Sequence, residues 1–340
     1  MAKRSVVTSV AHYVPERRVT NHDLSALMET SHEWIVERTG IHERRFIDSP
    51  EDTTLTLAER AARIALTRAS KTPQDIDLIV FATLSPDYYF PGVGVMLQRS
   101  LGCRTIPALD IRAQCSGLVY GLSVVDGFIR SNQAKCVLLV CSEVQSPVLD
   151  LTTRGRDMAV LFGDGAGALV IEAQEIGEEA ANLTDRGVID SYLGSDGEGA
   201  DVLCMKVPGT ARPGFISAQD IADRLVHPHM DGKVVFKNAV TRLAETAKTL
   251  LERNRITPSE IDLVVPHQAN LRINEMVREG LGLPKEKVFN NIQRYGNTTA
   301  ATIPICLSEA EEAGVLQQGM LVITLAFGAG FTWGGNLIRW

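Results

Sequence analysis

Three side chains stand out in this sequence because their types and positions could support catalysis: Cys115 in IRAQCSGLVYG, His267 in VVPHQANLRIN and Asn297 in RYGNTTAATIPI. Cys115 lies where a strand is expected to give way to an apolar helix. A thiol at a helix N-terminus has its pKa lowered by the helix dipole and by nearby amide donors, which favours the nucleophilic thiolate. His267 directly follows a strand, at the end where parallel α/β sheets bind ligands, and histidine commonly transfers protons or stabilises an oxyanion.

Each of the three also has a structural explanation. Free cysteine is among the most buried residue types, so Cys115 could simply be a core residue. A histidine at a strand end is usually a hydrogen-bonded polar residue, and Asn297 followed by two threonines fits a helix N-cap. These local patterns alone leave the choice open.

The chain repeats itself, and the repeat favours the functional interpretation. TPQDIDLIV at 72–80 returns as TPSEIDLVV at 257–265, each after a helix-like segment. Residues 109–130 and 288–314 share another plan, with a strand-like start, a turn and an apolar helix. Both halves then end in glycine-containing strands. Three echoes in the same order predict a duplication, in which the loops of the cysteine and the asparagine face each other across a pseudo-twofold axis.

The repeated strands are too apolar to be half exposed, which is typical of a sheet covered by helices on both faces. The sequence therefore predicts an α/β protein of two similar halves, residues 1–175 and 220–340. Residues 176–219 form the predicted connection, which holds one strand-like segment, VIDSYLGSDG, at 188–197.

Composition and charge exclude several function classes. The net charge of −7 argues against general nucleic-acid binding, and no apolar run approaches the roughly 20 residues that cross a membrane. The six cysteines show neither CxxC pairs nor a disulfide framework, so reduced thiols in the cytoplasm are expected. His227 and His229 lack companions at metal-ligand spacing and are expected in a loop, so no metal site is predicted.

Taken together, the motifs resemble those of beta-ketoacyl-acyl-carrier-protein synthase III, in the thiolase superfamily. They cover almost the whole chain in one order: TSHEWIVERTGIHERR, CSG, GDGAGA, VPHQANLRI, YGNTTAA and FGAGFTWG. The resemblance implies a thiolase-like five-layer αβαβα sandwich built from two duplicated halves, which agrees with the internal repeats.

The resemblance also implies an activity and a catalytic triad. Cys115, His267 and Asn297 would carry out a decarboxylative Claisen condensation of an acyl-CoA primer with malonyl-acyl-carrier protein, the step that starts fatty-acid synthesis. The backbone N–H groups of Cys115 and Ala329 would form the oxyanion hole, although most relatives have glycine where Ala329 stands. No cofactor is expected, because acyl-CoA and malonyl-acyl-carrier protein are substrates.

Further site residues come from the same resemblance. Trp34 and Arg154 would sandwich the CoA adenine, and Phe90 would reach across a homodimer to close the acyl pocket. The remaining positions that match the family are expected to contact CoA (Thr30, Arg38, Gly155, Asn270), an acidic carrier protein (Lys237, Arg272) and the acyl chain (Phe162, Phe327). Arg112 is expected to face away from the cysteine, because strand alternation puts the two out of phase.

One alternative is a related condensing enzyme or acyltransferase of secondary metabolism that has the same Cys-His-Asn triad. A papain-type Cys-His-Asn hydrolase is disfavoured by the local signature around the cysteine. A non-catalytic partner subunit is disfavoured because this chain retains all three residues.

Overall fold

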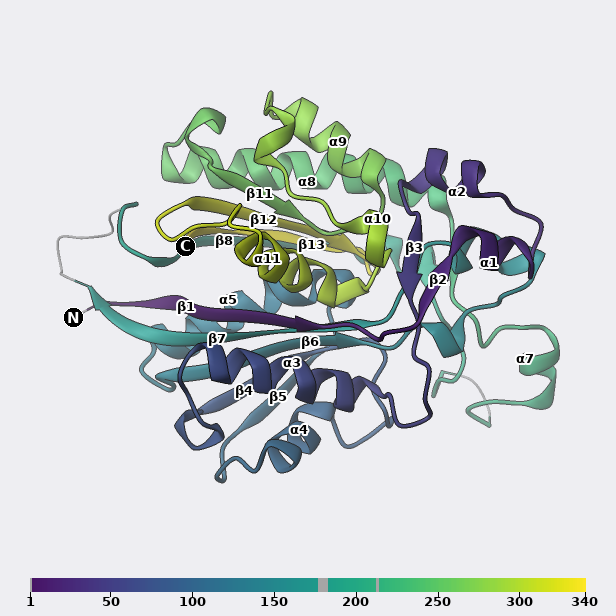
Figure 1. The fold of residues 1–340 in the computed structure, drawn as a ribbon, viewed down its shortest axis with the longest axis horizontal. Coiled ribbons are helices and arrows are strands. Elements are labelled where there is room, and N and C mark those ends of the chain that lie inside the picture. The colour runs from purple at the N-terminus through teal and green to yellow at the C-terminus, as the bar shows by residue number, and fades with distance from the viewer. Residues whose placement is uncertain (1, 177–182, 212–213) are drawn as a thin grey trace.

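Two β-sheets lie face to face, with helices between them and on their outer faces, in the computed structural model of this protein (Figure 1). The structure describes residues 2–176, 183–211 and 214–340. None of the described helices is both long and apolar enough to cross a bilayer.

The first sheet comes from the N-terminal half and has the strand order β1-β7-β6-β4-β5. Its strands are β1 (Ala2–Tyr13), β4 (Leu78–Ala82), β5 (Ala108–Ile111), β6 (Cys136–Glu143) and β7 (Gly165–Ile176). β4 runs parallel to β5 and β6, whereas β7 runs antiparallel to β6 and β1. Every residue of β4 and β6 is buried, as the continuous apolar sequence of β4 predicts.

The second sheet has the order β11-β12-β13-β8. Its strands are β8 (Gly187–Ser195), β11 (Leu263–Pro266), β12 (Leu321–Gly328) and β13 (Thr332–Arg339). β11 is parallel to β12, and an isolated bridge from Val264 to Val288 marks the place that β5 takes in the first sheet. β8 comes from the predicted connection and pairs with β13 as an edge strand.

The helices form three layers around the sheets (Figure 1). α3 (Thr54–Arg68) and α4 (Val93–Leu101) pack on the first sheet, and α8 (Gly232–Asn254) with α9 (Leu271–Gly280) forms the layer on the far side of the second. α5 (Gly117–Arg130) and α11 (Thr302–Glu312) lie between the sheets and contact both. This order of helix, sheet, helix, sheet and helix confirms the expected five-layer fold.

The repeated sequence folds twice into the same turn. In each copy a threonine N-caps a 3₁₀ turn, η1 (Pro73–Asp75) or η6 (Pro258–Glu260), and an acidic side chain three residues later accepts from its backbone N–H. That N···O distance is 2.7 Å for Thr72 and Asp75, and 2.8 Å for Thr257 and Glu260. The buried strands β4 and β11 follow directly.

The central helices differ from the outer ones because both of their sides are covered. In α3 the buried residues form one stripe at helical spacing, which includes Ala58, Ala61, Ala62 and Ala65. In α11 all residues from Thr302 to Ser308 are buried. The start of each central helix, where the predicted site residues lie, is therefore held inside the protein.

Shorter elements gather at one end of the molecule, on the right of Figure 1. They are β2 (Arg18–Thr20), β3 (Glu43–Arg45), α1 (Asn21–Ser25), α2 (His32–Thr39), α6 (Arg156–Ala159), α7 (Ala218–Ala222) and α10 (Ile292–Tyr295), and the short pair β9 (Leu203–Cys204) with β10 (His229–Met230). His229 thus lies in a two-residue strand, so the expectation of a loop there was wrong at this residue. The remaining 3₁₀ turns are η2 (Gln114–Ser116), η3 (Ser146–Val148), η4 (Thr153–Gly155), η5 (Gly197–Gly199), η7 (Lys285–Lys287) and η8 (Thr299–Ala301).

A buried arginine joins these short elements to the rest of the fold. Arg44 on β3 donates to the carbonyl oxygen of Val19 (3.1 Å), to Oδ1 of Asn21 (2.9 Å) and to the carbonyl oxygen of Val160 (2.8 Å). Burial lowers the pKa of Arg44 to about 10, so the guanidinium stays charged at neutral pH. It fixes the β2–β3 pair against the segment that leads to Phe162.

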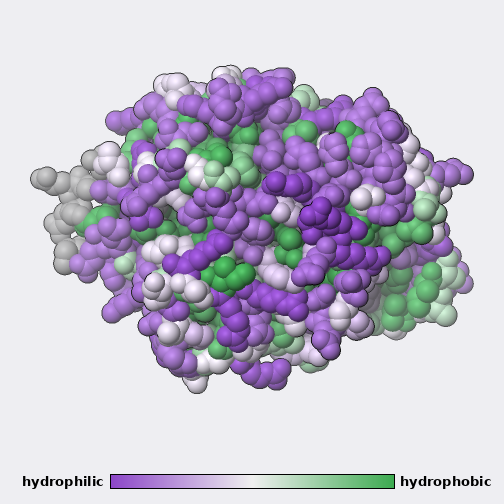
Figure 2. Space-filling view, in the orientation of Figure 1, coloured by the Kyte–Doolittle hydropathy of each residue, from purple (hydrophilic) through white to green (hydrophobic). Residues whose placement is uncertain are grey.

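The outer surface facing the viewer in Figure 2 is mostly hydrophilic, and apolar surface gathers at the end where α7 lies. The large apolar residues exposed in and near α7 are Phe215, Ile216, Ile221 and Leu225. A second exposed group, Tyr88, Tyr89 and Phe90, lies in the loop between β4 and α4.

We predict that Arg44→Leu lowers the free energy of unfolding by about 3 kcal/mol or more, because three buried acceptors lose their donor. Urea unfolding monitored by fluorescence measures this. The matched control is Arg18→Leu in the adjacent strand, where the guanidinium is 65% exposed and pairs with Glu43 at 3.8 Å. The control should change stability by no more than about 0.5 kcal/mol, and equal losses in both variants would contradict a special role for Arg44.

Candidate active site

One narrow cavity of about 90 Å³ is lined by Cys115, His267 and Asn297 together. Residues of both halves line it, and most of the others are apolar: Leu161, Phe162, Leu203, Met230, Val235, Phe236, Ala239, Leu243, Ala269, Ile273 and Phe327. The structure thus brings the three predicted catalytic residues to one place, although they lie far apart in the sequence.

Cys115 lies in η2, immediately before α5, and η2 contacts both β12 and η8. The chain can approach this closely because residue 328 is glycine: a Cβ there would lie 2.9 Å from the Cβ of Cys115. The sulfur is therefore enclosed by the end of β12 on one side and by the start of α5 on the other.

The electrostatics of Cys115 differ from the sequence expectation. Burial, with a smaller contribution from the carboxylate of Glu143, raises the pKa of the thiol to about 12. The nearby backbone N–H groups of Cys115 and Ala329 lower the pKa of the thiol but do not overcome burial. The lowered pKa that the sequence predicted for Cys115 is therefore wrong for the free thiol. Cys115 must transfer its proton to an acceptor when it reacts.

Ala329 supplies one of these two backbone donors without the conformational freedom of glycine. It does not adopt a positive φ, so its methyl group imposes no left-handed strain. The hydroxyl of Thr332 donates to the carbonyl oxygen of Ala329 at 3.1 Å, which helps to fix this turn. An oxyanion hole requires two N–H donors aimed at the oxygen of the tetrahedral intermediate that forms beside the sulfur, and these two backbone groups are the candidates.

His267 follows β11, and its backbone N–H donates to Leu325 in β12 at 2.7 Å. Burial lowers the pKa of the side chain to about 3, so the imidazole is neutral at neutral pH. Its Nδ1 lies 2.6 Å from Oγ1 of Thr302. Its Nε2 is buried and has no hydrogen-bond partner within the described structure, so this nitrogen is free to act on a group that enters the cavity.

Asn297 is oriented by backbone contacts on both sides. Its N–H donates to Leu161 at 2.8 Å, and its carbonyl accepts from Gly163 at 3.1 Å. Gly296 before it has φ of +62°, a conformation that favours glycine. The side-chain Oδ1 accepts from the N–H of Thr299 at 2.8 Å, so the Nδ2 amino group is the free donor. Asn297 therefore holds the first N–H of the turn η8 and also lines the cavity.

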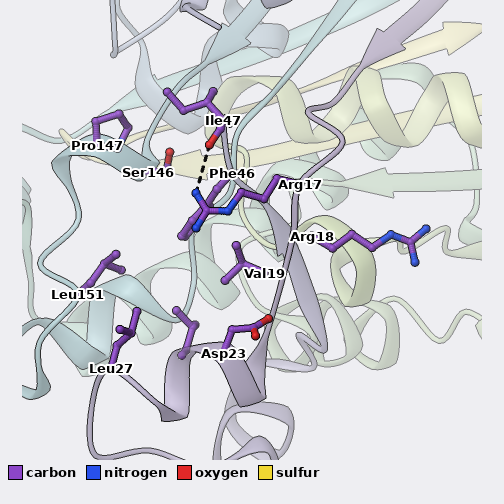
Figure 3. A pocket seen from close by; sticks show the side chains of 11 residues that line it. Arg17, Arg18, Val19, Asp23, Leu27, Phe46, Ile47, Ser146, Pro147 and Leu151 are labelled. Carbon is purple, nitrogen blue, oxygen red and sulfur yellow. Dashed lines mark hydrogen bonds between the residues drawn. The ribbon is translucent and has the colours of Figure 1, made fainter. Parts of the chain in front are cut away.

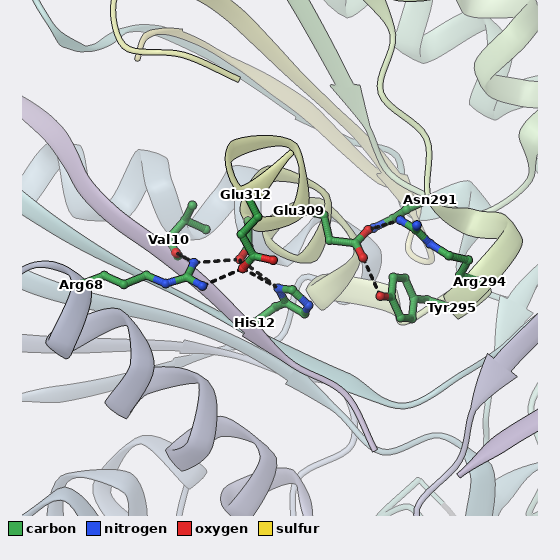
Figure 4. Close-up of polar contacts among 9 residues, drawn as sticks. Val10, His12, Arg68, Asn291, Arg294, Tyr295, Glu309 and Glu312 are labelled. Carbon is green, nitrogen blue, oxygen red and sulfur yellow. Dashed lines mark hydrogen bonds and ion pairs between the residues drawn. The ribbon is translucent and has the colours of Figure 1, made fainter. Parts of the chain in front are cut away.

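A carboxylate on α11 holds the segment before Asn297, as Figure 4 shows. Glu309 accepts from Asn291 (2.9 Å), Arg294 (2.5 Å) and the hydroxyl of Tyr295 (2.5 Å). These three donors lie in or next to α10, so Glu309 fixes the short helix that delivers Gly296 and Asn297. Nothing in the sequence singled this residue out, because its partners lie on a different element.

The residues expected at CoA lie around α2 and α9. Trp34 packs against two guanidinium groups, with Arg38 at 4.6 Å and Arg156 at 4.8 Å from its ring centroid. Arg154 instead donates to the carbonyl oxygen of Asp223 at 2.9 Å. Arg156, which stands two positions later in TTRGRD, is the arginine of this segment that lies over Trp34, and the sequence did not show which of the two arginines would turn toward the tryptophan.

The other expected CoA contacts are near the same place. Asn270 lines the cavity, caps α9 by accepting from Arg272, and donates to the carbonyl oxygen of Arg38 at 2.9 Å. The hydroxyl of Thr30 is buried and has no partner within the described residues. Gly155 approaches the backbone so closely that a Cβ would lie 2.1 Å from the carbonyl oxygen of Asp150.

The two cations expected to meet a carrier protein lie on neighbouring helices. Lys237 on α8 and Arg272 on α9 are both exposed, and these helices pack together. The guanidinium of Arg272 lies 5.4 Å from the ring centroid of Phe236, which lines the cavity. Arg272 therefore stands close to the cavity wall.

The expected acyl-pocket residues divide into two groups. Phe162 and Phe327 line the cavity, whereas Phe90 is 80% exposed and lies outside it. Arg112 is exposed, as expected, but β5 ends at Ile111 and Cys115 lies in η2, so strand alternation is not the reason. Within one chain, the structure does not bring Phe90 to the site.

A larger surface pocket of about 460 Å³ lies elsewhere, beside β2 and α1 (Figure 3). Its wall includes Arg17, Asp23, Phe46 and Leu151, and it contains none of the residues expected at the site. It holds no thiol or imidazole, so volume alone is a poor guide to the chemistry of this protein.

Comparison with known proteins finds relatives along almost the whole chain. A family model of 3-oxoacyl-[acyl-carrier-protein (ACP)] synthase III matches residues 109–197. A second family model, which describes the C-terminal part of the same family, matches residues 251–340. The beta-ketoacyl-[acyl-carrier-protein] synthase III of Rhodospirillum centenum is 43% identical over 340 residues, 100% of both chains, and that of Chlorobaculum tepidum is 40% identical over 339 residues, 99% of each. The crystal structure of 3-oxoacyl-[acyl-carrier-protein] synthase III from Aquifex aeolicus has a TM-score of 0.87 at 38% identity, and the match covers 99% of this chain and 100% of that one.

We predict that His267→Gln makes the stability of the protein less dependent on pH. The folded state holds the pKa of His267 at about 3, whereas the unfolded chain binds a proton at the ordinary value of 6.5. The unfolded state therefore binds more protons between these values, and stability is lost as pH falls below about 6.5. Between pH 7 and pH 5 the unmodified protein should lose about 2 kcal/mol more than the variant, measured by urea unfolding.

The control for this comparison is His229→Gln, which removes an exposed imidazole. It should lose as much stability on acidification as the unmodified protein. If His267→Gln also behaves like the unmodified protein, the imidazole of His267 is not held neutral by burial.

Proposed function

This chain belongs to the beta-ketoacyl-[acyl-carrier-protein] synthase III family, and we propose that it condenses an acyl-CoA primer with malonyl-acyl-carrier protein, the step that starts fatty-acid synthesis, with Cys115, His267 and Asn297 as catalytic residues. The observation that carries the assignment of roles is the cavity that these three side chains line together.

In the first half-reaction Cys115 is the nucleophile. Its sulfur attacks the thioester carbonyl of the acyl-CoA, and its proton passes to Nε2 of His267. The negative oxygen of the tetrahedral intermediate accepts from the N–H groups of Cys115 and Ala329. The C–S bond to CoA then breaks, the proton moves from His267 to the CoA sulfur, and Cys115 remains acylated. The need for an acceptor follows from the raised pKa of the thiol.

In the second half-reaction the malonyl thioester loses its carboxylate as carbon dioxide. The electron pair of the broken C–C bond delocalises onto the thioester oxygen, where negative charge develops. Nδ2 of Asn297 and an N–H at Nε2 of His267 would donate to that oxygen, which is supported by their shared cavity and by the engaged Oδ1 of Asn297. The resulting carbanion attacks the acyl carbon on Cys115, whose sulfur leaves as a thiolate and takes up one proton. No step needs a metal or a redox cofactor, because the thioester itself delocalises the charge.

The cavity wall suits the proposed substrates. Its narrow, apolar lining accommodates the extended arm shared by CoA and the carrier protein, and Trp34 offers an aromatic face for the adenine. The cationic side chains of Lys237 and Arg272 complement an acidic carrier protein near the cavity wall.

A homodimer is part of the proposal. β5 is an edge strand whose outer side is unpaired in the described chain, and Leu109 on it is exposed. Such an edge readily pairs with another strand. Pairing of two β5 edges would bury the neighbouring Tyr88, Tyr89 and Phe90 and bring Phe90 to the acyl pocket of the second copy.

A reactive thiol also requires a reducing compartment, which fits a cytoplasmic location.

The decisive test is incubation with radiolabelled acyl-CoAs of different chain length, followed by malonyl-acyl-carrier protein. We expect label on the unmodified protein and none on Cys115→Ala, and a labelled beta-ketoacyl product with one carbon dioxide released per condensation. Transfer of the acyl group without carbon dioxide would assign an acyltransferase, and label on Cys115→Ala would remove the proposed nucleophile.

The same assay separates the roles of the other two residues. Asn297→Ala should be acylated at a normal rate but release carbon dioxide about 10²–10³ times more slowly, the cost of losing one oxyanion donor. His267→Ala should be slowed in both half-reactions, because it loses the proton acceptor and the donor. Normal condensation by either variant would contradict the assignment.

We further predict that Trp34→Ala raises KM for acyl-CoA about tenfold and leaves kcat within about twofold, because the adenine is remote from the reacting carbonyl. Arg156→Ala should raise KM more than Arg154→Ala, since Arg156 is the arginine that lies over the ring. Steady-state kinetics at saturating malonyl-acyl-carrier protein give these values. An unchanged KM for Trp34→Ala would make this tryptophan an ordinary surface residue.

A further inference from the structure

His267 has two opposite tasks in the proposed reaction, both at Nε2. During acylation this nitrogen must accept the proton of Cys115, and during decarboxylation it must donate to the malonyl oxygen. A neutral imidazole carries only one N–H, so no single tautomer performs both tasks. Burial keeps the imidazole neutral, because it lowers the pKa of His267 to about 3.

The other nitrogen of the ring is held by Thr302, the first residue of α11. Oγ1 of Thr302 lies 2.6 Å from Nδ1 of His267 and 3.1 Å from the carbonyl oxygen of Thr299. Thr302 and His267 are both buried. The single hydroxyl proton of Thr302 therefore has two acceptors within reach, and the choice between them sets the tautomer of His267.

The buried polar groups around Thr302 remain hydrogen-bonded whichever of the two acceptors its hydroxyl chooses. When the hydroxyl donates to Thr299, it accepts the N–H at Nδ1, and Nε2 carries a lone pair. When the hydroxyl donates to Nδ1, Nε2 carries the hydrogen. The carbonyl of Thr299 keeps a partner in either case, because the backbone N–H of Thr302 also donates to it. Neither arrangement leaves a buried polar group unpaired at this end of the ring, so the two differ little in energy.

We infer that Thr302 is a positioning residue that lets His267 alternate between its two neutral tautomers, so that Nε2 accepts a proton in the first half-reaction and donates a hydrogen bond in the second. The inference rests on the proposed function. Before acylation Nε2 has no hydrogen-bond partner among the described residues, so a lone pair on this nitrogen is open to the proton of Cys115 when the thiol reacts. After acylation the sulfur has no hydrogen, and the tautomer with the hydrogen on Nε2 is favoured.

The hydroxyl also supports the charged form of the ring that exists briefly during acylation. When Nε2 takes the Cys115 proton, the imidazolium carries a second N–H at Nδ1, which donates to Oγ1 of Thr302. The proton then leaves with the CoA sulfur and His267 becomes neutral again, so the first half-reaction is balanced. The decarboxylation step needs only the neutral ring as a donor.

The test compares Thr302→Val, which has the same shape but no hydroxyl, with Thr302→Ser, which keeps one. In Thr302→Val the imidazolium would have a buried N–H without an acceptor. Rapid-quench acylation by acyl-CoA should therefore slow by about 10- to 100-fold, the effect of one hydrogen bond to a charged group. Condensation from an enzyme acylated beforehand by long incubation should change by less than about threefold. Thr302→Ser should restore acylation to within about threefold.

A matched control is Thr246→Val, which removes a buried hydroxyl that donates to the carbonyl of Arg242 within α8. It should alter neither half-reaction. Equal slowing of both half-reactions in Thr302→Val, or no slowing of acylation, overturns the role of Thr302. If the unmodified protein is not acylated at Cys115 at all, the proposed function fails instead, so the two failures are distinguishable.

The tautomer can also be observed without altering Thr302. In protein labelled with ¹⁵N-histidine, the His267 signals are identified by their absence from His267→Gln. We expect their ¹⁵N shifts to move on acylation from hydrogen mainly at Nδ1 to hydrogen mainly at Nε2. Shifts of one fixed tautomer, the same before and after acylation, would overturn the inference even if Thr302→Val does not fold.

Discussion

Burial of the reacting groups is the constraint on which this site depends. It keeps the imidazole of His267 neutral and raises the pKa of the Cys115 thiol, so the site carries no charge on either group before reaction. Such a site cannot rely on a preformed thiolate. In the proposed reaction it moves one proton when the sulfur forms its bond, and it needs fixed dipoles where negative charge develops. The backbone N–H groups at Cys115 and the amide of Asn297 are dipoles of this kind.

Duplication explains how these dipoles come to face one cavity. The two central helices begin in corresponding turns, η2 and η8, which contact each other between the sheets. Each turn begins with a residue of positive φ, Gln114 at 47° and Thr299 at 49°. Such a conformation costs about 1–3 kcal/mol and persists where packing enforces it. It occurs at the same place in both halves, next to Cys115 in one and close to Asn297 in the other.

Polar contacts between distant elements then hold each group in place. Glu309 fixes the helix before Asn297, Arg44 fixes the strand pair beside the segment of Phe162, and Thr302 fixes the ring of His267. In the proposed function, α11 therefore has two roles besides packing between the sheets. Thr302 in its first turn controls which ring nitrogen of His267 carries the hydrogen, and Glu309 in its third turn orients the loop of Asn297.

Most of the architecture could be predicted from the sequence, because the internal repeat and the continuous apolar strands report burial directly. The repeat predicted two similar α/β halves, whereas the five-layer order, the family and the three candidate catalytic residues came from the resemblance that the motifs carry. What the sequence could not provide were properties that depend on distant neighbours. The pKa of Cys115, the choice of Arg156 beside Trp34, and the roles of Glu309 and Thr302 arise from contacts between elements far apart in the chain. Periodicity and motif spacing describe local structure, whereas desolvation and hydrogen-bond geometry exist only once the two halves have packed together.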